Sequence, residues 1–294
     1  MLIARLIADP DGVLSRIDAL KHAIEPVGAP LAISTEAIPE GVLVQIEAFS
    51  GTKVLLRGVL DDHFPGTDGL IADDRIALPL VFVSDMDSTM IGQECIDELA
   101  DYAGIKPQIA AITERAMLGE LDFESALRER VALLAGLEEG AIQRCLAERI
   151  RPNPGARVLV ETLKAVGCKT VLVTGGFHHF ADPVAEGLGF DRVVANRLEV
   201  ADGALTGALL GPVVDSAVKR AVLLEELTAA GAGAVGMAAG DGANDIPMLE
   251  AAHLSVAYDA KPKARAAADC WIDRGDLTAV LVLLGIPPVQ WASG

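Results

Sequence analysis

The stretch that decides the fold is Val81-Phe82-Val83-Ser84-Asp85-Met86-Asp87-Ser88-Thr89, in which an apolar, β-branched run ends in two carboxylates. Such a run is typical of a strand that is covered on both faces. Ligands of open α/β sheets bind at the carboxyl ends of the strands, so we expect chemistry at Asp85 and Asp87. Two acids this close are costly unless a cation or a proton offsets them. An Asp-rich turn that caps a helix is the alternative interpretation.

Two later segments repeat this arrangement and favour a functional site. Val171-Leu172-Val173-Thr174-Gly175-Gly176 is an apolar run that ends in a hydroxyl and two glycines. The acidic loop Gly240-Asp241-Gly242-Ala243-Asn244-Asp245 follows a third apolar run over residues 234–239. Between them, Lys219 lies early in a helix predicted over residues 216–229. Three strand ends therefore carry polar groups, in a fixed order.

This order of motifs resembles the haloacid dehalogenase superfamily and, within it, the phosphoserine phosphatase family. Residues 85–89 fit the Asp-x-Asp-Ser-Thr signature of that family, and residues 240–245 fit its acidic loop. The stretches at 94–99 and 123–131 also resemble the family. The resemblance runs from about Leu80 to about Gly285 and leaves out roughly the first 75 residues.

A catalytic role for the Asp pair is what the resemblance implies. Cleavage of a phosphate monoester needs an in-line nucleophile, neutralisation of the phosphate oxygens and a proton for the leaving alkoxide. By resemblance, Asp85 is the nucleophile that forms an aspartyl-phosphate. Asp87 is the general acid and then the general base. The spacing alone does not say which Asp attacks.

A magnesium site is expected at the same strand ends. Asp241, together with Asp85 and the main-chain carbonyl of Asp87, would form an all-oxygen site that suits Mg²⁺. Asp245 would orient this cluster from behind. Taken alone, Asp241 would more readily be interpreted as an acidic turn between glycines.

The resemblance also implies which residues bind phosphate. They are the Thr174 hydroxyl, where the family more commonly has Ser, the Gly175 N–H and Lys219. Asn244 would contact the substrate or its phosphate. A solvated helix lysine is the ordinary alternative for Lys219.

Substrate choice is expected to come from the segment between the first two strands. Glu94 would pair with an ammonium group, and Arg130 would bind a carboxylate with two parallel hydrogen bonds. Phe123 lies in register with the same family pattern. Without the family, Glu94 and Arg130 would be read as ordinary helix-surface charges. A zwitterion with a phosphate describes O-phospho-L-serine.

Composition narrows the class of protein. The chain has 294 residues, 51% of them hydrophobic, and a net charge of −18, which argues against nucleic-acid and anionic-membrane partners. We expect no membrane segment and no signal peptide, because the start lacks a long apolar core and Gly285 and later prolines interrupt the apolar tail. Four scattered cysteines without metal-ligand spacing indicate reduced thiols and a cytoplasmic location.

Two domains are predicted. Residues 1–75 read as a small α+β domain with strands at 2–7, 42–48 and 53–60, a helix at 12–24 and a boundary in the turn-rich stretch 61–69. It is either a regulatory or dimerisation module, compatible with a homodimer, or a packing appendage. Residues 76–294 read as a phosphatase domain with a doubly wound, mainly parallel α/β sheet. Four predicted helices make an inserted cap at about 91–152, and they cover residues 91–103, 108–118, 123–135 and 141–150.

The function expected from sequence is a Mg²⁺-dependent phosphoserine phosphatase that catalyses the last step of serine biosynthesis. A phosphotransferase that uses another hydroxyl acceptor stays open, because these residues do not distinguish water from an acceptor. A non-catalytic amino-acid sensor on the same scaffold is a third alternative. Loss of either Asp85 or Asp87 would have favoured the sensor, and both are present.

Overall fold

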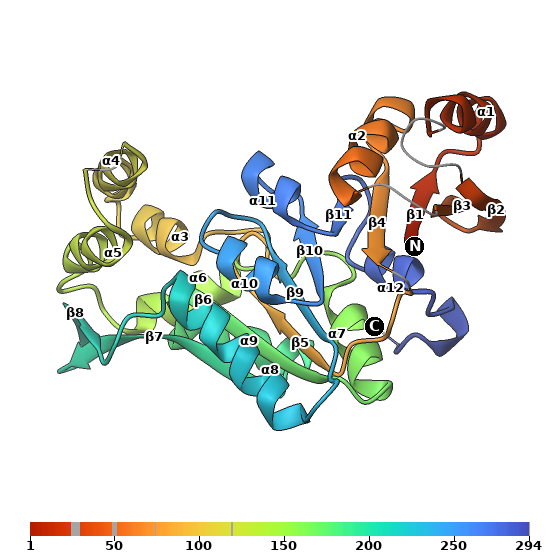
Figure 1. Ribbon diagram of the computed structural model, residues 1–294. Coiled ribbons are helices and arrows are strands. Elements are labelled where there is room, and N and C mark those ends of the chain that lie inside the picture. The colour runs from red at the N-terminus through yellow and green to blue at the C-terminus, as the bar shows by residue number, and fades with distance from the viewer. Residues whose placement is uncertain (25–29, 49–51, 74, 119, 294) are drawn as a thin grey trace.

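The computed structural model describes residues 1–24, 30–48, 52–73, 75–118 and 120–293. Within these ranges the strands form one 11-stranded sheet in the order β2-β3-β1-β4-β11-β10-β9-β5-β6-β7-β8 (Figure 1). Six neighbouring strands run parallel. They are β11 (Cys270–Ile272), β10 (Leu254–Tyr258), β9 (Gly236–Gly240), β5 (Val81–Ser84), β6 (Lys169–Phe177) and β7 (Arg192–Ala201). The predicted doubly wound, mainly parallel α/β sheet is confirmed.

Helices cover both faces of the parallel strands. One face carries α9 (Ser216–Ala230), α10 (Ile246–Ala251) and α11 (Pro262–Ala267), and the other carries α7 (Ala156–Ala165), α8 (His178–Leu188) and α12 (Thr278–Leu284). Strand β5 shows why both faces need cover: Val81 and Val83 enter one apolar core, whereas Phe82 enters the other. Side chains alternate across a strand, so an all-apolar strand must be buried on both sides.

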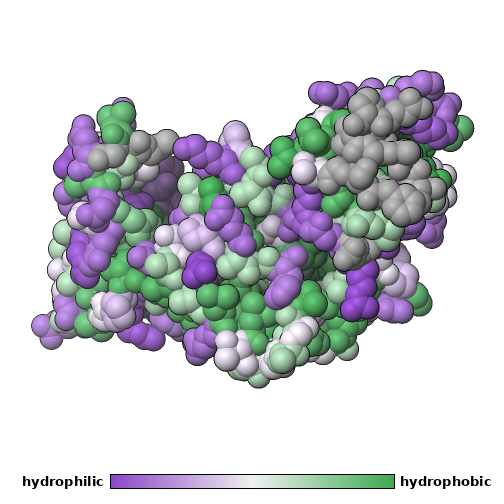
Figure 2. Space-filling model, in the orientation of Figure 1, coloured by the Kyte–Doolittle hydropathy of each residue, from purple (hydrophilic) through white to green (hydrophobic). Residues whose placement is uncertain are grey.

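A helical cap follows β5, as predicted. It consists of α3 (Cys95–Tyr102), α4 (Lys106–Met117), α5 (Phe123–Ala132) and α6 (Gly140–Arg149). The first cap helix begins at Cys95 rather than at the predicted residue 91, because a turn containing Ser88 at φ 54° precedes it. Helix α5 begins after Asp122, whose Oδ1 accepts a hydrogen bond from Ser125 N at 2.8 Å. Figure 2 shows the lobe of the cap helices at the left and the N-terminal unit at the right, with a dip in the surface between them.

An antiparallel hairpin of β7 and β8 ends the sheet beside the cap. Strand β8 (Ala204–Leu210) pairs with β7 around a turn in which Asp202 (φ 51°) and Gly203 (φ 77°) both have left-handed backbone. Turns of this kind match the twist of a hairpin, and Asp-Gly is a residue pair that favours them. Gly136 N donates to the Leu205 carbonyl, and Leu205 N donates to the Leu137 carbonyl, both at 2.8 Å, so the hairpin is attached to the segment that follows α5.

The N-terminal unit has its own core. It consists of β1 (Leu2–Ala8), α1 (Val13–Ile24), β2 (Pro30–Ile38), β3 (Gly41–Ala48), α2 (Lys53–His63) and β4 (Asp68–Asp73). Strand β1 lies between β3 and β4 and is antiparallel to both. Its side chains Leu2, Ala4, Leu6 and Ala8 pack with those of the two helices in a separate cluster, whereas Ile7 joins a core of the parallel sheet.

The strand predicted over residues 53–60 is wrong, because this segment is the helix α2. Thr52 caps it, with its hydroxyl oxygen accepting from Leu55 N at 3.3 Å. Leu56 and Leu60, four residues apart, supply the buried face, whereas Val54 is 80% exposed. Helical spacing therefore decides the structure of a segment whose apolar run also suits a strand.

The N-terminal unit is joined to the parallel sheet through β4 and β11, which pair antiparallel at Leu70–Cys270 and Gly69–Trp271. Trp271 is buried in the N-terminal core, its Nε1 donates to the Thr67 carbonyl at 2.7 Å, and the Arg57 guanidinium lies 3.2 Å from a Trp271 ring centroid. The sheet therefore continues from the N-terminal unit into the core.

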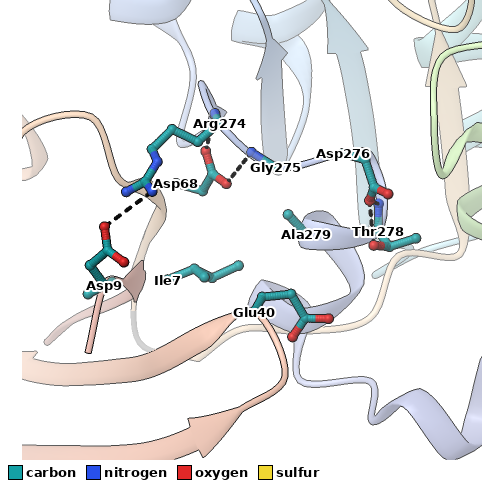
Figure 3. Close-up of a pocket in the computed structure, with 10 residues that line it drawn as sticks. Ile7, Asp9, Glu40, Asp68, Arg274, Gly275, Asp276, Thr278 and Ala279 are labelled. Atoms are coloured by element: carbon teal, nitrogen blue, oxygen red, sulfur yellow. Dashed lines mark hydrogen bonds and ion pairs between the residues drawn. The ribbon is translucent and has the colours of Figure 1, made fainter. Parts of the chain in front are cut away.

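Asp68 adds a polar clamp at this junction (Figure 3). Its buried carboxylate accepts three backbone hydrogen bonds of 2.7–2.9 Å, from the N–H groups of Asp273, Arg274 and Gly275. Arg274 in turn pairs with Asp9 of the N-terminal unit at 3.2 Å. A cavity of about 290 Å³ lies beside this clamp.

None of the helices in the described ranges is both long and apolar enough to cross a bilayer.

Candidate active site

Asp85 lies directly after β5 and is nearly fully buried. Its Oδ1 accepts a hydrogen bond from Met86 N at 2.8 Å and lies 2.8 Å from Lys219 Nζ. Among the described residues, no hydrogen-bond donor reaches Oδ2. One carboxylate oxygen is thus held in place, and the other remains available as a nucleophile or as a metal ligand.

Lys219 lies beneath this carboxylate, in the first turns of α9. Its Nζ is 2.8 Å from Asp85 Oδ1 and 2.7 Å from Asp245 Oδ1, and the three side chains are at most 5% exposed. Asp245 Oδ2 accepts hydrogen bonds from the N–H groups of Asp241 at 3.2 Å and Gly242 at 3.0 Å. Asp245 therefore links the lysine to the acidic loop.

Burial dominates the electrostatics of this group. Desolvation and the nearby Asp245 raise the pKa of Asp85 well above its usual value, and Lys219 opposes this shift. For Lys219, desolvation opposes the charged form, but the two carboxylates outweigh it and raise the pKa of the ammonium. The lysine is therefore charged at neutral pH and favours ionisation of Asp85.

Asp87 lies two residues further on, near Glu94 of the cap. Desolvation first, and then the nearby Glu94, raise the pKa of Asp87 to about 7. Its Oδ1 accepts a hydrogen bond from Cys95 N at 3.3 Å. A Cβ on Gly176 would lie 3.0 Å from Asp87 Oδ2, so a larger residue there would crowd the Asp87 carboxylate. A carboxyl with a pKa near 7 can both donate and accept a proton at neutral pH.

Thr174, Gly175 and Gly176 form a bulge in β6 beside the Asp pair. Thr174 is buried, and its Oγ1 accepts a hydrogen bond from Gly176 N at 2.9 Å. The hydroxyl hydrogen of Thr174 is therefore free to be donated elsewhere. Glycines at this position leave the backbone open to a ligand.

The acidic loop after β9 supplies Asp241 and Asn244. The loop passes very close to Asp245, because a Cβ on Gly240 would lie 2.5 Å from the Asp245 side chain. Asp241 Oδ2 lies 3.0 Å from Lys261 Nζ, and Lys261 N donates to the Asp241 carbonyl at 2.9 Å. Asp241 is thus held in place by Lys261, which contacts both its main-chain carbonyl and its carboxylate.

Three carboxylates at these strand ends are close enough together to hold a cation. Asp85, Asp241 and Asp245 each offer a carboxylate oxygen within 4.8 Å of the others. Both oxygens of Asp245 already accept hydrogen bonds, whereas in the described chain Asp85 and Asp241 each keep one oxygen without a donor. The donor set is therefore all oxygen, with Asp245 holding the other two residues in place.

These groups face a cavity of about 430 Å³ between the strand ends and the cap. Nine of the eleven residues predicted from sequence line it: Asp85, Asp87, Glu94, Phe123, Arg130, Thr174, Gly175, Asp241 and Asn244. The other two, Lys219 and Asp245, are buried behind the cavity wall. The phosphate-binding role of Lys219 stays a prediction.

The cap contributes the polar groups on the far wall. Glu94 Oε1 accepts a hydrogen bond from Ser88 Oγ at 2.9 Å, and burial raises the pKa of Glu94. Arg130 Nε donates to the Ala126 carbonyl of its own helix at 3.3 Å. Burial lowers the pKa of Arg130, and Asp97 and Glu94 oppose this. Within the described residues, Arg130 makes no ion pair with a carboxylate.

The sequence analysis missed Lys261 and Asn196. Lys261 lines the cavity and follows β10, so its place after an apolar strand was a usable signal. Asn196 is buried within β7 and donates a hydrogen bond to the Gly175 carbonyl in the bulge of β6. A single polar residue inside a strand gave no comparable signal.

With this geometry in view, residues 82–250 match the family model of haloacid dehalogenase-like hydrolases, and residues 233–284 match a second model with the same description. The chain belongs to the haloacid dehalogenase-like hydrolases. The resemblance inferred from the motifs is thereby confirmed.

Named relatives of this hydrolase agree with the family. A phosphoserine phosphatase of Albidiferax ferrireducens is 47% identical over 205 residues, which cover 68% of this chain and 86% of the relative. A haloacid dehalogenase-family hydrolase structure from Salmonella enterica serovar Typhi matches with a TM-score of 0.84 at 26% identity, covering 97% of this chain and 99% of the other. A phospho-aspartyl intermediate analogue of phosphoserine phosphatase matches with a TM-score of 0.63 at 37% identity, covering 70% and 99%.

Proposed function

We propose that this hydrolase converts O-phospho-L-serine to L-serine and phosphate, the last step of serine biosynthesis. The observation that carries the proposal is the pair Asp85 and Asp87 in one cavity with Glu94 and Arg130. The pair can cleave a phosphate ester, and the other two residues match the charges of an amino acid. Relatives named phosphoserine phosphatase support the same substrate.

The proposed reaction has two steps. In the first, Asp85 Oδ2 forms a bond to phosphorus while the bond from phosphorus to the serine oxygen breaks. Asp87 gives its proton to that oxygen, and L-serine leaves. In the second step Asp87 takes a proton from a water molecule whose oxygen forms a bond to phosphorus. The bond from phosphorus to Asp85 Oδ2 breaks, so phosphate is released and the Asp85 carboxylate is restored. General acid–base help of this kind typically contributes about 10²–10⁴-fold to the rate. The pKa of Asp87 near 7 supports both of its roles.

Four groups are proposed to bind the phosphate oxygens: the Thr174 hydroxyl, the Gly175 N–H, Asn244 and Lys219. Thr174 has a hydroxyl hydrogen to donate because Gly176 N occupies its oxygen. Lys219 acts from behind the wall, where its charge opposes the raised pKa of Asp85. These donors are matched to the equatorial oxygens of a transferring phosphoryl group.

Mg²⁺ is the proposed cofactor. Its ligands would be Asp85, Asp241 and the main-chain carbonyl of Asp87, with Asp245 in support. Carboxylate and carbonyl oxygens suit Mg²⁺, and this structure offers an all-oxygen cluster. When bound, the ion supplies positive charge that offsets the carboxylates and the phosphate.

Specificity is proposed to come from the cap. Arg130 would bind the substrate carboxylate, and Glu94 would pair with its ammonium group. Phe123 lies against the phosphate-side loop, because a Cβ on Gly175 would be 3.1 Å from its ring. The aromatic ring would therefore close the cavity over the bound substrate.

We further propose a cytoplasmic enzyme of two domains. The four cysteines are buried and free, which supports a reducing compartment. The separate apolar core of the N-terminal unit supports a domain over residues 1–75, with the phosphatase domain over residues 76–294. The small domain would be a regulatory or dimerisation module through which a homodimer could form.

Phosphate release tests the proposal. Purified enzyme is given phosphoserine, phosphoethanolamine, phosphothreonine and a simple alkyl phosphate, each with Mg²⁺ and with EDTA. The proposal predicts that phosphoserine has the highest kcat/KM and that EDTA abolishes turnover. Equal kcat/KM values for phosphoserine and the alkyl phosphate would refute the assigned substrate, and full activity in EDTA would refute the cofactor.

A further inference from the structure

The bulge that carries Thr174 interrupts the hydrogen-bond ladder between β6 and β7. The two strands pair in regular parallel register up to Val173 and Val194, and pairing resumes at Phe177 and Asn196. Three residues of β6 therefore stand opposite a single residue of β7. Bulged residues lose their ladder partners, and their buried peptide groups need others.

The Asn196 side chain supplies one of these partners. Its Nδ2 donates to the Gly175 carbonyl at 2.8 Å, and its Oδ1 accepts from Val214 N at 2.8 Å. Asn196 is only 2% exposed. Both ends of the amide are thus occupied by backbone groups from two other segments, and neither bond competes with water.

The hydrogen bond from Asn196 to Gly175 fixes the orientation of the Thr174 hydroxyl. The carbonyl of Gly175 and the N–H of Gly176 belong to one planar trans peptide, so they point in opposite directions. With the carbonyl held by Asn196, the N–H points to Thr174 Oγ1, where the distance is 2.9 Å. Because this oxygen then accepts a hydrogen bond, the Thr174 hydroxyl donates its own hydrogen in another direction.

The second bond reaches the helix that carries Lys219. Val214 directly precedes Asp215, whose carboxylate caps α9 by accepting from Val218 N at 2.9 Å. Lys219 follows one turn later and pairs with Asp85. The buried Asn196 amide therefore connects the β6 bulge with the segment that leads into α9. This helix carries Lys219, which pairs with the proposed nucleophile Asp85.

We propose that Asn196 is a positioning residue of the phosphate site, acting through the Gly175–Gly176 peptide to aim the Thr174 hydroxyl at a bound phosphoryl group. The inference rests on the proposed function only for the role of Thr174. Asn196 itself does not line the cavity. Its effect must therefore depend on Thr174, which makes the proposal testable by coupling.

The experiment is a double-mutant cycle on phosphate affinity. Inorganic phosphate binding in the presence of Mg²⁺ is measured by calorimetry for wild type, Asn196→Leu, Thr174→Val and the double variant. Leucine matches the shape of asparagine without its donor and acceptor, and valine does the same for threonine. Loss of a hydrogen bond to a charged group predicts about 10–100-fold weaker binding for Thr174→Val. Asn196→Leu alone should weaken binding by at least about tenfold, but by less than about threefold in the Thr174→Val background.

Two further variants separate positioning from general destabilisation. Leu198→Ala removes an equally buried side chain two positions along β7, so it should lower Tm while phosphate affinity stays within about twofold. Asn196→Ser, with a short hydroxyl that cannot bridge both partners, replaces the leucine variant if that one does not fold. Its effect on affinity should also vanish in the Thr174→Val background.

The outcomes distinguish this inference from the proposed function. Equal losses from Asn196→Leu with and without the Thr174 hydroxyl would overturn the positioning role. A matching loss of phosphate affinity in Leu198→Ala would overturn it as well, because destabilising β7 at another position would then be enough to weaken phosphate binding. Wild type that binds phosphate but does not hydrolyse phosphoserine would refute only the assigned substrate. Wild type that does not bind phosphate would overturn both.

Discussion

Replacing Lys219 by methionine tests how the buried acids are kept charged. Methionine keeps most of the volume but removes the ammonium that lies 2.8 Å from Asp85 and 2.7 Å from Asp245. Two carboxylates that are at most 5% exposed then lack their cation. Breaking a buried pair on one side typically costs about 3–5 kcal/mol. At about 2–4 °C per kcal/mol, Tm in EDTA at pH 8 should fall by about 6–20 °C.

The pH dependence of this loss has a definite sign. Without Lys219, the group that opposes the raised pKa of Asp85 is gone, so the folded variant binds a proton more tightly than the unfolded chain does. Stability of the variant therefore rises as pH falls from the folded pKa of Asp85 toward the unfolded value near 4. The pKa of Lys219 is raised, so in wild type its contribution stays in place throughout pH 5–8. The Tm deficit should consequently be smaller at pH 5 than at pH 8.

Differential scanning calorimetry at both pH values measures this effect, with Lys164→Met as the matched control. Lys164 pairs with Asp191 at 3.2 Å, but its side chain is 33% exposed. Such pairs are worth about 1 kcal/mol or less. A Lys219→Met protein within about 2 °C of wild type at pH 8 would refute the reasoning. A deficit that is the same at both pH values would show that Asp85 is not the group left unpaired.

The remaining predictions concern catalysis and specificity. Asp85→Asn should lower phosphate release by more than about 10⁴-fold without lowering Tm, and a rate within tenfold of wild type would exclude Asp85 as the nucleophile. Asp87→Asn should stabilise the EDTA-treated protein at pH 8 by up to about 4 kcal/mol, because each unit of the shift to a pKa near 7 corresponds to about 1.4 kcal/mol. Since a raised carboxyl pKa weakens the fold only above the unfolded pKa, urea unfolding at pH 4 should show little difference. Arg130→Ala should weaken transition-state binding of phosphoserine by about 2–5 kcal/mol, measured as a lower kcat/KM. The same variant should spare phosphoethanolamine, which has no carboxylate. Glu94→Gln should hurt both of those substrates and spare alkyl phosphates, whereas equal losses for all would leave both cap residues a merely structural role.

Sequence pattern was sufficient for the phosphatase core because its signals are local. The apolar run before Asp85 and the helical spacing of the cap each involve residues that are close together in the sequence. Residues 53–60 failed because their apolar run fits both periods, and the choice depended on the Thr52 cap and on packing of Leu56 and Leu60. Short apolar runs carry this ambiguity in general.

The junction between the two units could not be predicted in the same way. Its contacts join residues about 200 positions apart, such as Asp68 with the N–H groups of residues 273–275. From sequence alone Asp68 reads as part of a charged, turn-rich linker. Its carboxylate is in fact buried, and the pairing of β4 with β11 extends the sheet across the boundary. Non-local pairing leaves no pattern in either segment.

The site was predictable where residues belong to motifs and not where they act through others. Asp85, Asp87 and Asp241 stand at strand ends, so the fold alone brings them together. Asn196 acquires its role from a carbonyl of β6 and an N–H before α9, and these meet only in the folded chain. Lys261 was visible after a strand, but its importance depends on its contact with Asp241.

The charges of the cavity explain why cation and substrate should bind together under the proposed function. Four carboxylates and two cations line the described cavity wall: Asp85, Asp87, Glu94, Asp241, Arg130 and Lys261. Lys219 adds little net charge, because Asp245 behind the wall offsets it. A phosphate dianion would enter a negative site in a protein of net charge −18. Mg²⁺ between Asp85 and Asp241 and a proton on Asp87 reverse this balance, and each binding event then favours the other by the same factor. Under the proposed function, the acidic cavity would disfavour anions that arrive without the cation, so selectivity would begin before Arg130 and Glu94 contact the substrate.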